Sequence, residues 1–164
     1  MNSGTGLQTR LGTLNLVNPF ILASGPPTAS GEMIRRAFAA GWGGAVIKTI
    51  RPDGMVIRDL SPRFGAWRGE KGELLGFENY ELLSRKTVSY WTAEIGAIRQ
   101  EFPDRILIAS IMGDTDPATW QNLACQVREA GADAIELNMS CPHGMPEAGV
   151  GSAIGQNPAM VREL

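Results

Sequence analysis

One run of this chain carries most of the information about its fold, Ala134-Ile135-Glu136-Leu137-Asn138-Met139-Ser140-Cys141. Its first half has the largely apolar composition of a buried parallel strand. Its second half places an amide, a hydroxyl and a thiol directly after that strand. Because parallel α/β folds bind ligands at the carboxyl ends of their strands, this run predicts a parallel sheet with a site at one edge.

The rest of the chain repeats the same strand and helix pattern. A short hairpin is predicted around Gly12-Thr13, and apolar strands are predicted over residues 18–25, 44–49, 105–111 and 132–138. Helices are expected over about 30–41, 80–101 and 116–129 and again from Pro158. This alternation predicts right-handed βαβ units, either as an open four-stranded sheet or as half of an eight-stranded barrel.

Three finer predictions accompany this pattern. Ser30 and Asp116 are expected to cap their helices, and Met33, Ile34, Ala37 and Phe38 to form the buried stripe of the first one. Cys125 is expected to be a small core residue of the third helix. Residues 51–78 are rich in glycine, proline and charge, and are predicted to be a lid or binding loop.

Composition limits the function classes. The chain has 164 residues, enough for one domain with a core, and a net charge of −2, which does not favour nucleic acid or an anionic membrane surface. No apolar run approaches the roughly 20 residues of a membrane span, and no signal peptide is evident. The two cysteines lack metal-ligand spacing, so no metal site is expected. A reducing, cytoplasmic setting is expected instead of an oxidising one.

The first predicted strand argues against a dinucleotide-binding fold. It is followed by Ala23-Ser24-Gly25-Pro26-Pro27 rather than by the Gly-x-Gly-x-x-Gly that cradles a pyrophosphate.

Seven motifs follow one another along the chain in the order in which a known enzyme family has them. They are Asn18 to Ser24, Ala40 to Thr49, Ser61 to Arg63, Gly76 to Asn79, Ile108 to Gly113, Gly131 to Asn138, and Ser140 to Gly144 with Gly155-Gln156. With these motifs the chain resembles the flavin domain of dihydropyrimidine dehydrogenases and of the catalytic subunit of their bacterial NAD-dependent relatives. It resembles dihydroorotate dehydrogenases more distantly. The resemblance covers nearly the whole chain from about residue 7.

The resemblance implies a TIM (β/α)8 barrel with flavin mononucleotide (FMN) over the carboxyl ends of its strands. Residues 1–164 correspond to the first half only, a (β/α)4 unit preceded by a short β-hairpin. The implied reaction adds or removes hydrogen across the 5,6 bond of a pyrimidine such as uracil or thymine. NAD(P)H is the implied ultimate electron donor, through a flavin or iron–sulfur partner domain or subunit, and an oligomer is expected.

Site residues follow from the same resemblance. Cys141 corresponds to the family's acid–base cysteine, and a thiol can donate and accept a proton near neutral pH. The cofactor-binding positions are Ala23, Ser24, Lys48, Thr49 and Asn138. The substrate-binding positions are Asn79, Asn138, Met139 and Ser140. An asparagine side chain suits a pyrimidine edge because it offers both a donor and an acceptor.

Structural readings stand beside these assignments. Cys141 could be a buried structural cysteine, Asn79 a helix cap, Ser140 a turn cap, and Lys48 a lysine reaching the rim. His143 and Glu147 are expected to be loop residues rather than catalysts. Arg63, Trp67 and Arg68 lie in the long loop, and for them two alternatives stand equally: they cover the flavin or meet a partner subunit, or they belong to a solvated loop. The alternative functions are a dihydroorotate dehydrogenase-like oxidation and a non-catalytic half-barrel, whose exposed strand edges would favour association.

Overall fold

A four-stranded parallel sheet forms the centre of the protein. The computed structural model describes residues 6–56, 62, 64–80, 82–141 and 149–164. The strands lie in the order β3-β4-β7-β8, which is also their order along the chain, and comprise β3 (Ile21–Leu22), β4 (Gly44–Val46), β7 (Ile106–Ile111) and β8 (Ala134–Leu137). The predicted parallel α/β architecture is therefore confirmed, with a first strand shorter than expected.

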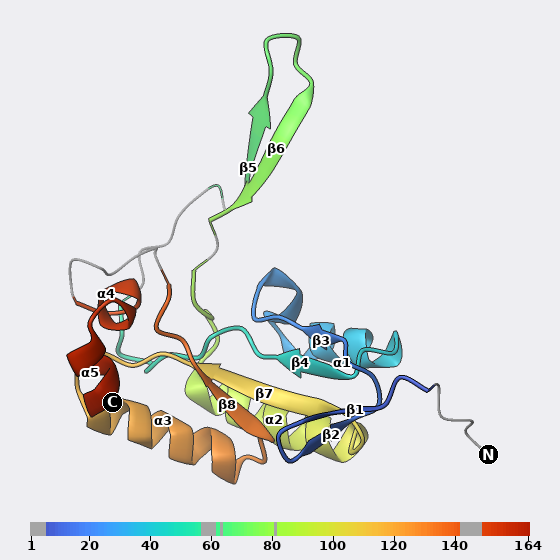
Figure 1. Cartoon of the computed structure of the whole chain (residues 1–164), viewed down its shortest axis with the longest axis vertical. Coiled ribbons are helices and arrows are strands. Elements are labelled where there is room, and N and C mark those ends of the chain that lie inside the picture. The colour runs from blue at the N-terminus through green and yellow to red at the C-terminus, as the bar shows by residue number, and fades with distance from the viewer. Residues whose placement is uncertain (1–5, 57–61, 63, 81, 142–148) are drawn as a thin grey trace.

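Helices connect successive strands and pack against one another in sequence (Figure 1). They are α1 (Gly31–Ala39), α2 (Val88–Glu101) and α3 (Pro117–Glu129), preceded by the 3-10 turn η1 (Pro26–Thr28) and followed by α4 (Ser152–Gly155) and α5 (Pro158–Glu163). Both predicted N-caps are present, since Ser30 accepts from the Met33 amide and Asp116 from the Ala118 amide. Helix α1 contacts α2, and α2 contacts α3.

The core lies between the sheet and these helices. Helix α2 contributes Trp91, Ile95 and Ile98, all fully buried, and β7 contributes Leu107 and Ile111. Alternate residues of a strand point to opposite faces, so β7 sends Leu107, Ala109 and Ile111 to the helices and its remaining three side chains to the opposite face.

A small hairpin precedes the sheet, as predicted. Strands β1 (Thr9–Leu11) and β2 (Leu14–Leu16) pair in antiparallel register around Gly12-Thr13. Gly12 has a φ of 59°, which a two-residue hairpin turn requires at its first position and which glycine adopts without strain.

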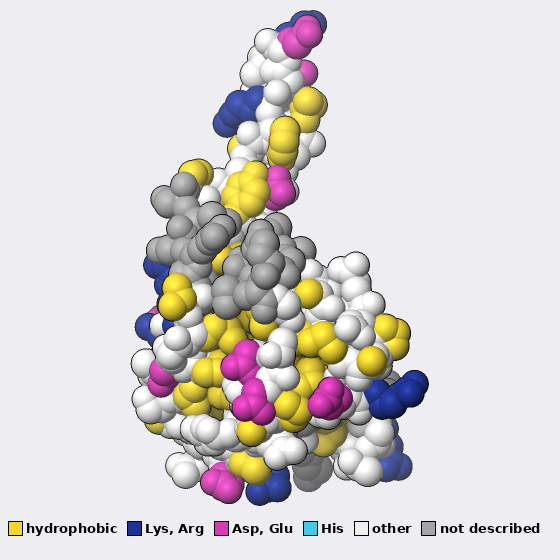
Figure 2. Space-filling model, turned by 90° about the vertical axis from the view of Figure 1, so that its left-hand side faces the viewer, with side chains coloured by type: hydrophobic (Ala, Val, Ile, Leu, Met, Phe, Trp, Pro, Cys, Tyr) yellow, Lys and Arg dark blue, Asp and Glu magenta, His cyan; other side chains and the backbone are white. Residues whose placement is uncertain are grey.

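The prediction of a loop over residues 51–78 was wrong for its second half. Strands β5 (Phe64–Arg68) and β6 (Leu74–Asn79) pair as an antiparallel hairpin that projects from the body of the molecule (Figure 1). Hydrophobic side chains lie along this hairpin (Figure 2), and Phe64 stacks on Phe77 with 5.4 Å between ring centroids. Glycines and charges at the turn concealed the alternation of its apolar residues.

Other expectations also need correction. Helix α2 begins at Val88 rather than near Tyr80, with Thr87 as its N-cap. Met33 is 43% exposed and lies outside the buried stripe of α1, and Cys125 is exposed on α3 rather than buried.

Strand β8 is parallel as predicted but is not buried, with Leu137 50% exposed. It is one of the two edge strands of the sheet, and among the described residues no strand pairs with its outer side. Within the described ranges, no helix is long and apolar enough to cross a membrane.

Candidate functional site

A group of polar side chains links the carboxyl ends of all four parallel strands. Thr49 lies just after β4, and its Oγ1 is 2.9 Å from Ser110 Oγ in β7 and 3.3 Å from Ser24 Oγ after β3. Asn138 follows β8 and donates its Nδ2 hydrogen to Thr49 Oγ1 over 2.8 Å. We call Ser24, Thr49, Ser110 and Asn138 the strand-end network.

Parallel pairing explains why these distant residues meet. The Asn138 amide donates to the Ile111 carbonyl, which continues the ladder of β7 and β8 beyond their last residues. The Ile50 amide likewise donates to the Ser110 carbonyl. Since the strands run in the same direction, their carboxyl ends lie at one edge of the sheet.

A cavity of about 440 Å³ opens at this edge. It is lined by Ala23, Ser24, Lys48, Thr49, Leu82, Leu83, Glu136, Leu137, Asn138, Ser140 and Cys141. All five predicted cofactor-binding residues are in this lining, together with the predicted acid–base cysteine. Its size lies within the range of ligand-binding pockets, roughly 300–1,000 Å³.

Lys48 brings a cation to this wall. It is only 7% exposed, at the end of an apolar strand, and Thr49 beside it is 3% exposed. Burying an ammonium group is unfavourable unless polar groups surround it. A lysine held in this position can therefore interact with an electron-rich edge of a bound ligand.

Asn138 has a fixed orientation within the network. Its Oδ1 accepts from the backbone amide of Ser140 over 3.2 Å, while its Nδ2 donates to Thr49. Both ends of the side-chain amide are thus engaged, and the described residues offer no acceptor to the second Nδ2 hydrogen, which leaves it for a further bond.

The backbone around Cys141 is held by the segment that begins helix α4. The Cys141 carbonyl accepts from the Ser152 amide over 3.1 Å. Gly151 approaches so closely that an added Cβ would lie 2.6 Å from the Cys141 carbonyl oxygen, and an added Cβ on Gly155 would collide with the Met139 carbonyl oxygen. The glycines after the cysteine therefore allow close packing of backbone on backbone.

Two predicted substrate positions do not line the cavity. Asn79 is exposed at the end of β6, in the hairpin rather than before a helix. Met139 is half-buried and packs against the core. Arg63, His143 and Glu147 lie outside the described residues, and Trp67 and Arg68 lie on the projecting hairpin.

Four residues of this region were not predicted from the sequence. Leu82, Leu83 and Glu136 line the cavity, and Ser110 is fully buried behind it. Ser110 could have been found, because it is the one hydroxyl in the otherwise apolar strand Ile106–Ile111. Leu82 and Leu83 were assigned to a helix that in fact begins after them.

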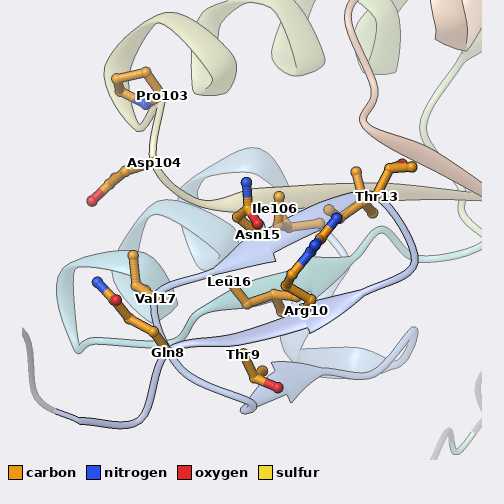
Figure 3. Close-up of a pocket in the computed structure, with 11 residues that line it drawn as sticks. Gln8, Thr9, Arg10, Thr13, Asn15, Leu16, Val17, Pro103, Asp104 and Ile106 are labelled. Carbon is orange, nitrogen blue, oxygen red and sulfur yellow. The ribbon is translucent and has the colours of Figure 1, made fainter.

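A larger cavity, of about 640 Å³, lies at the opposite end of the strands (Figure 3). Its lining includes Arg10 and Asn15 of the β1–β2 hairpin, and Asp104 and Ile106 at the start of β7. None of the predicted site residues belongs to it. In (β/α) folds this amino-terminal end of the strands supports stability rather than chemistry, so the smaller cavity is the candidate site.

The chain is similar to curated dehydrogenases. It is 37% identical over 163 aligned residues, 96% of this chain, to the chloroplastic dihydropyrimidine dehydrogenase (NADP(+)) of Arabidopsis thaliana. It is 40% identical over 146 residues to the NAD-dependent dihydropyrimidine dehydrogenase subunit PreA of Escherichia coli K12. It is 36% identical over 160 residues to the catalytic subunit of dihydroorotate dehydrogenase B (NAD(+)) of Pyrococcus abyssi.

The chain spans only part of these relatives, namely 38%, 34% and 48% of their respective lengths. No protein-family model matches it. The similarity to the two dihydropyrimidine dehydrogenases nevertheless extends over 96% and 89% of this chain. The resemblance to dihydropyrimidine dehydrogenases that the sequence motifs indicated is thereby confirmed.

Proposed function

We propose that this chain is the part of a flavin-dependent oxidoreductase that holds an FMN ring against a pyrimidine, and that the enzyme adds or removes hydrogen at the pyrimidine 5,6 bond. The observation that carries the proposal is the cavity in which Cys141, Asn138 and Lys48 come together at the strand ends. The names of the relatives, dihydropyrimidine dehydrogenases, supply the reaction class.

The lining of the cavity suits a flat, polar heteroaromatic ring. Small residues, Ala23 and Ser24, form one wall and allow close approach, and Leu82 and Leu83 provide apolar surface. Lys48, Ser24 and Asn138 bring hydrogen-bond donors to the same space. When bound, FMN would supply hydride transfer, and Lys48 and Thr49 would hold the electron-rich edge of its ring.

Cys141 is the proposed acid–base group. Adding hydrogen to the 5,6 bond requires one hydride and one proton, on neighbouring carbons. The thiol of Cys141 would give this proton during reduction and take it back during oxidation. Asn138 and Ser140, which line the cavity, would bind the pyrimidine. Asn79 and Met139 lie outside this lining, and the family resemblance alone supports them as further substrate positions.

The fold we propose is the first half of a TIM barrel. In a doubly wound sheet the strand order reverses, whereas in a barrel each strand lies beside the one before it. The order β3-β4-β7-β8 contains no reversal. The proposal assigns residues 1–164 to barrel strands one to four of a single FMN-binding domain.

Electrons would come ultimately from NAD(P)H, through a flavin or iron–sulfur partner domain or subunit. Support comes from the relatives, two of which are named as subunits of NAD-dependent enzymes. Dihydroorotate is the second candidate substrate, because the chain is 36% identical to a dihydroorotate dehydrogenase subunit.

The test is a visible absorption spectrum of the intact protein, followed by anaerobic addition of dihydrouracil or dihydroorotate. We expect flavin bands that bleach with dihydrouracil, and a bleaching rate that falls about 10²- to 10⁴-fold in Cys141→Ala. Cys125→Ala is the matched control, since Cys125 is exposed on α3 and outside the cavity.

Two outcomes would contradict the proposal. Bleaching by dihydroorotate alone would transfer the activity to the second candidate. A colourless intact protein that takes up no FMN would favour the non-catalytic half-barrel.

A further inference from the structure

We infer that Ser110 is a positioning residue that orients the hydrogens of the strand-end network, so that Ser24 and Asn138 both present hydrogen-bond donors to the ligand. This inference rests on the proposed flavin site. It adds that this part of the cavity lining presents hydrogen-bond donors rather than acceptors to the ligand. Ser110 itself cannot touch a ligand in the cavity, because it is 0% exposed.

The direction of the bonds follows from counting hydrogens. Ser110 Oγ has one side-chain partner among the described residues, Thr49 Oγ1 at 2.9 Å. If Thr49 donated to Ser110, the buried hydroxyl hydrogen of Ser110 would have no acceptor within the described part of the chain, which is strongly unfavourable. Ser110 therefore donates to Thr49.

The orientation of Thr49 is then fixed as well. A hydroxyl offers two acceptor lone pairs and one hydrogen. Asn138 Nδ2 and Ser110 Oγ occupy both acceptor positions of Thr49 Oγ1. Its remaining hydrogen has one neighbouring acceptor in the network, Ser24 Oγ at 3.3 Å.

The consequence appears at the cavity wall. Ser24 accepts from Thr49, so its own hydrogen is directed away from the network, and Ser24 lines the cavity. Asn138 also lines the cavity, and no described residue accepts its second Nδ2 hydrogen. The wall is thus a pair of donors, complementary to a ligand edge that carries carbonyl oxygens or unprotonated ring nitrogens. The pyrimidine edge of an oxidised flavin ring has this chemistry.

The experiment measures FMN binding to the flavin-depleted intact protein, by quenching of FMN fluorescence. The variants are Ser110→Ala, Ser24→Ala and the double substitution. Ser24→Ala removes one fixed donor directly. Ser110→Ala removes the same donor indirectly, because the Ser24 hydroxyl can then turn back and donate to Thr49. Each single substitution is expected to weaken FMN binding about three- to tenfold. In the Ser24→Ala background, Ser110→Ala is expected to have no further effect on the dissociation constant.

Ser84→Ala is the matched control. Ser84 is also a buried serine, but its Oγ is not in the cavity lining and accepts from Trp91 Nε1 over 2.7 Å and from the Lys86 amide over 3.1 Å. Its own amide donates to the Thr49 carbonyl, and alanine retains this backbone bond. Its loss is expected to lower the unfolding midpoint and to leave FMN affinity unchanged. If Ser110→Ala does not fold, Ser110→Cys takes its place in the same set of single and double variants. The cysteine side chain fills the space of the serine, and its thiol is only a weak donor.

Three results would overturn the inference. The first is an unchanged FMN affinity in Ser110→Ala. The second is a double variant whose loss of FMN affinity equals the product of the losses in Ser110→Ala and Ser24→Ala. The third is a loss of FMN affinity in Ser84→Ala as large as that in Ser110→Ala. In each case the wild-type protein still binds FMN, so the proposed function stands. A wild-type protein that binds no FMN overturns the proposed function and this inference together.

Discussion

Three glycines lie close to Cys141 in the chain, and replacing each with alanine tests how an added methyl group lowers the free energy of unfolding. Two causes can be separated: strain of a backbone with positive φ, and overlap of the new Cβ with a backbone carbonyl. Gly151 has φ 61° and ψ −122°, a backbone conformation that residues with a Cβ avoid, and an added Cβ would also lie 2.6 Å from the Cys141 carbonyl oxygen. Gly149 has a positive φ of 75°, but the nearest atom to its added Cβ is Thr115 Cγ2 at 3.8 Å. Gly155 has the backbone collision without a positive φ.

The expected free energies of unfolding differ accordingly. Gly149→Ala should lower stability by about 1–2 kcal/mol, the strain of a left-handed residue that carries a Cβ. Gly155→Ala should lower it by about 1–3 kcal/mol, because backbone has to move to relieve the overlap. Gly151→Ala combines both effects and should lower stability by about 2–5 kcal/mol.

The assay combines urea unfolding with the rate at which iodoacetamide alkylates Cys141, in the intact protein and in a Cys125→Ser background. Gly151→Ala and Gly155→Ala displace the backbone that fixes Cys141, so the alkylation rate should change in both. It should be unchanged in Gly149→Ala. Equal losses of stability and equal alkylation rates in Gly149→Ala and Gly151→Ala would refute the reasoning, since the collision would then have no consequence.

Three other substitutions test single contacts. Tyr80 donates to Glu78, and this bond raises the pKa of Tyr80 above its ordinary value of 10.0; Glu78→Gln should lower that pKa in a titration of phenolate absorbance. The bond stabilises the fold below the ordinary pKa, and its contribution is lost as the pH rises through the raised pKa of Tyr80. Asp53 Oδ1 accepts from the Val88 amide at the start of α2 over 2.9 Å, so Asp53→Ala should lower stability by about 1 kcal/mol in urea. Ile95→Ala removes a fully buried side chain and should lower stability by about 2–5 kcal/mol in the same assay.

Each of these has its own contradicting result. An unchanged tyrosine titration in Glu78→Gln would mean that the carboxylate does not control the Tyr80 hydroxyl. Unchanged stability in Asp53→Ala would mean that water satisfies the Val88 amide equally well. A loss below about 1 kcal/mol for Ile95→Ala would mean that the core closes around the missing atoms.

Local signals in the sequence were sufficient for the elements that form the site. Apolar runs predicted the strands, Ser30 and Asp116 marked the helix starts, and the polar residues after Leu137 predicted a site at that edge of the sheet. These signals succeed because each acts over a few residues. The other lining residues that were predicted, Ala23, Ser24, Lys48 and Thr49, came from the family resemblance. Ser24, Lys48 and Asn138 come together because parallel strands end at one edge, which the order of elements implies.

The features that the sequence did not predict have a different physical origin, because they depend on which segments lie next to one another in space. β8 has the composition of a buried strand but is an edge strand, so Leu137 is exposed. Leu82 and Leu83 are buried apolar residues that line the cavity, so their composition resembles that of the helix that follows. Ser110 gave only one weak signal, and its role depends on Thr49, which is 61 residues away along the chain.

The strand-end network also has a consequence for the order of folding. Thr49 is bonded to side chains 25, 61 and 89 residues away along the sequence. Each of these bonds closes a long loop, and such contacts form only after local structure has restricted the chain. Helices α1, α2 and α3 can form from nearby residues, whereas the cavity requires all four strand ends at once. The ability to bind a ligand should therefore appear in the last step of folding, after helical structure is complete.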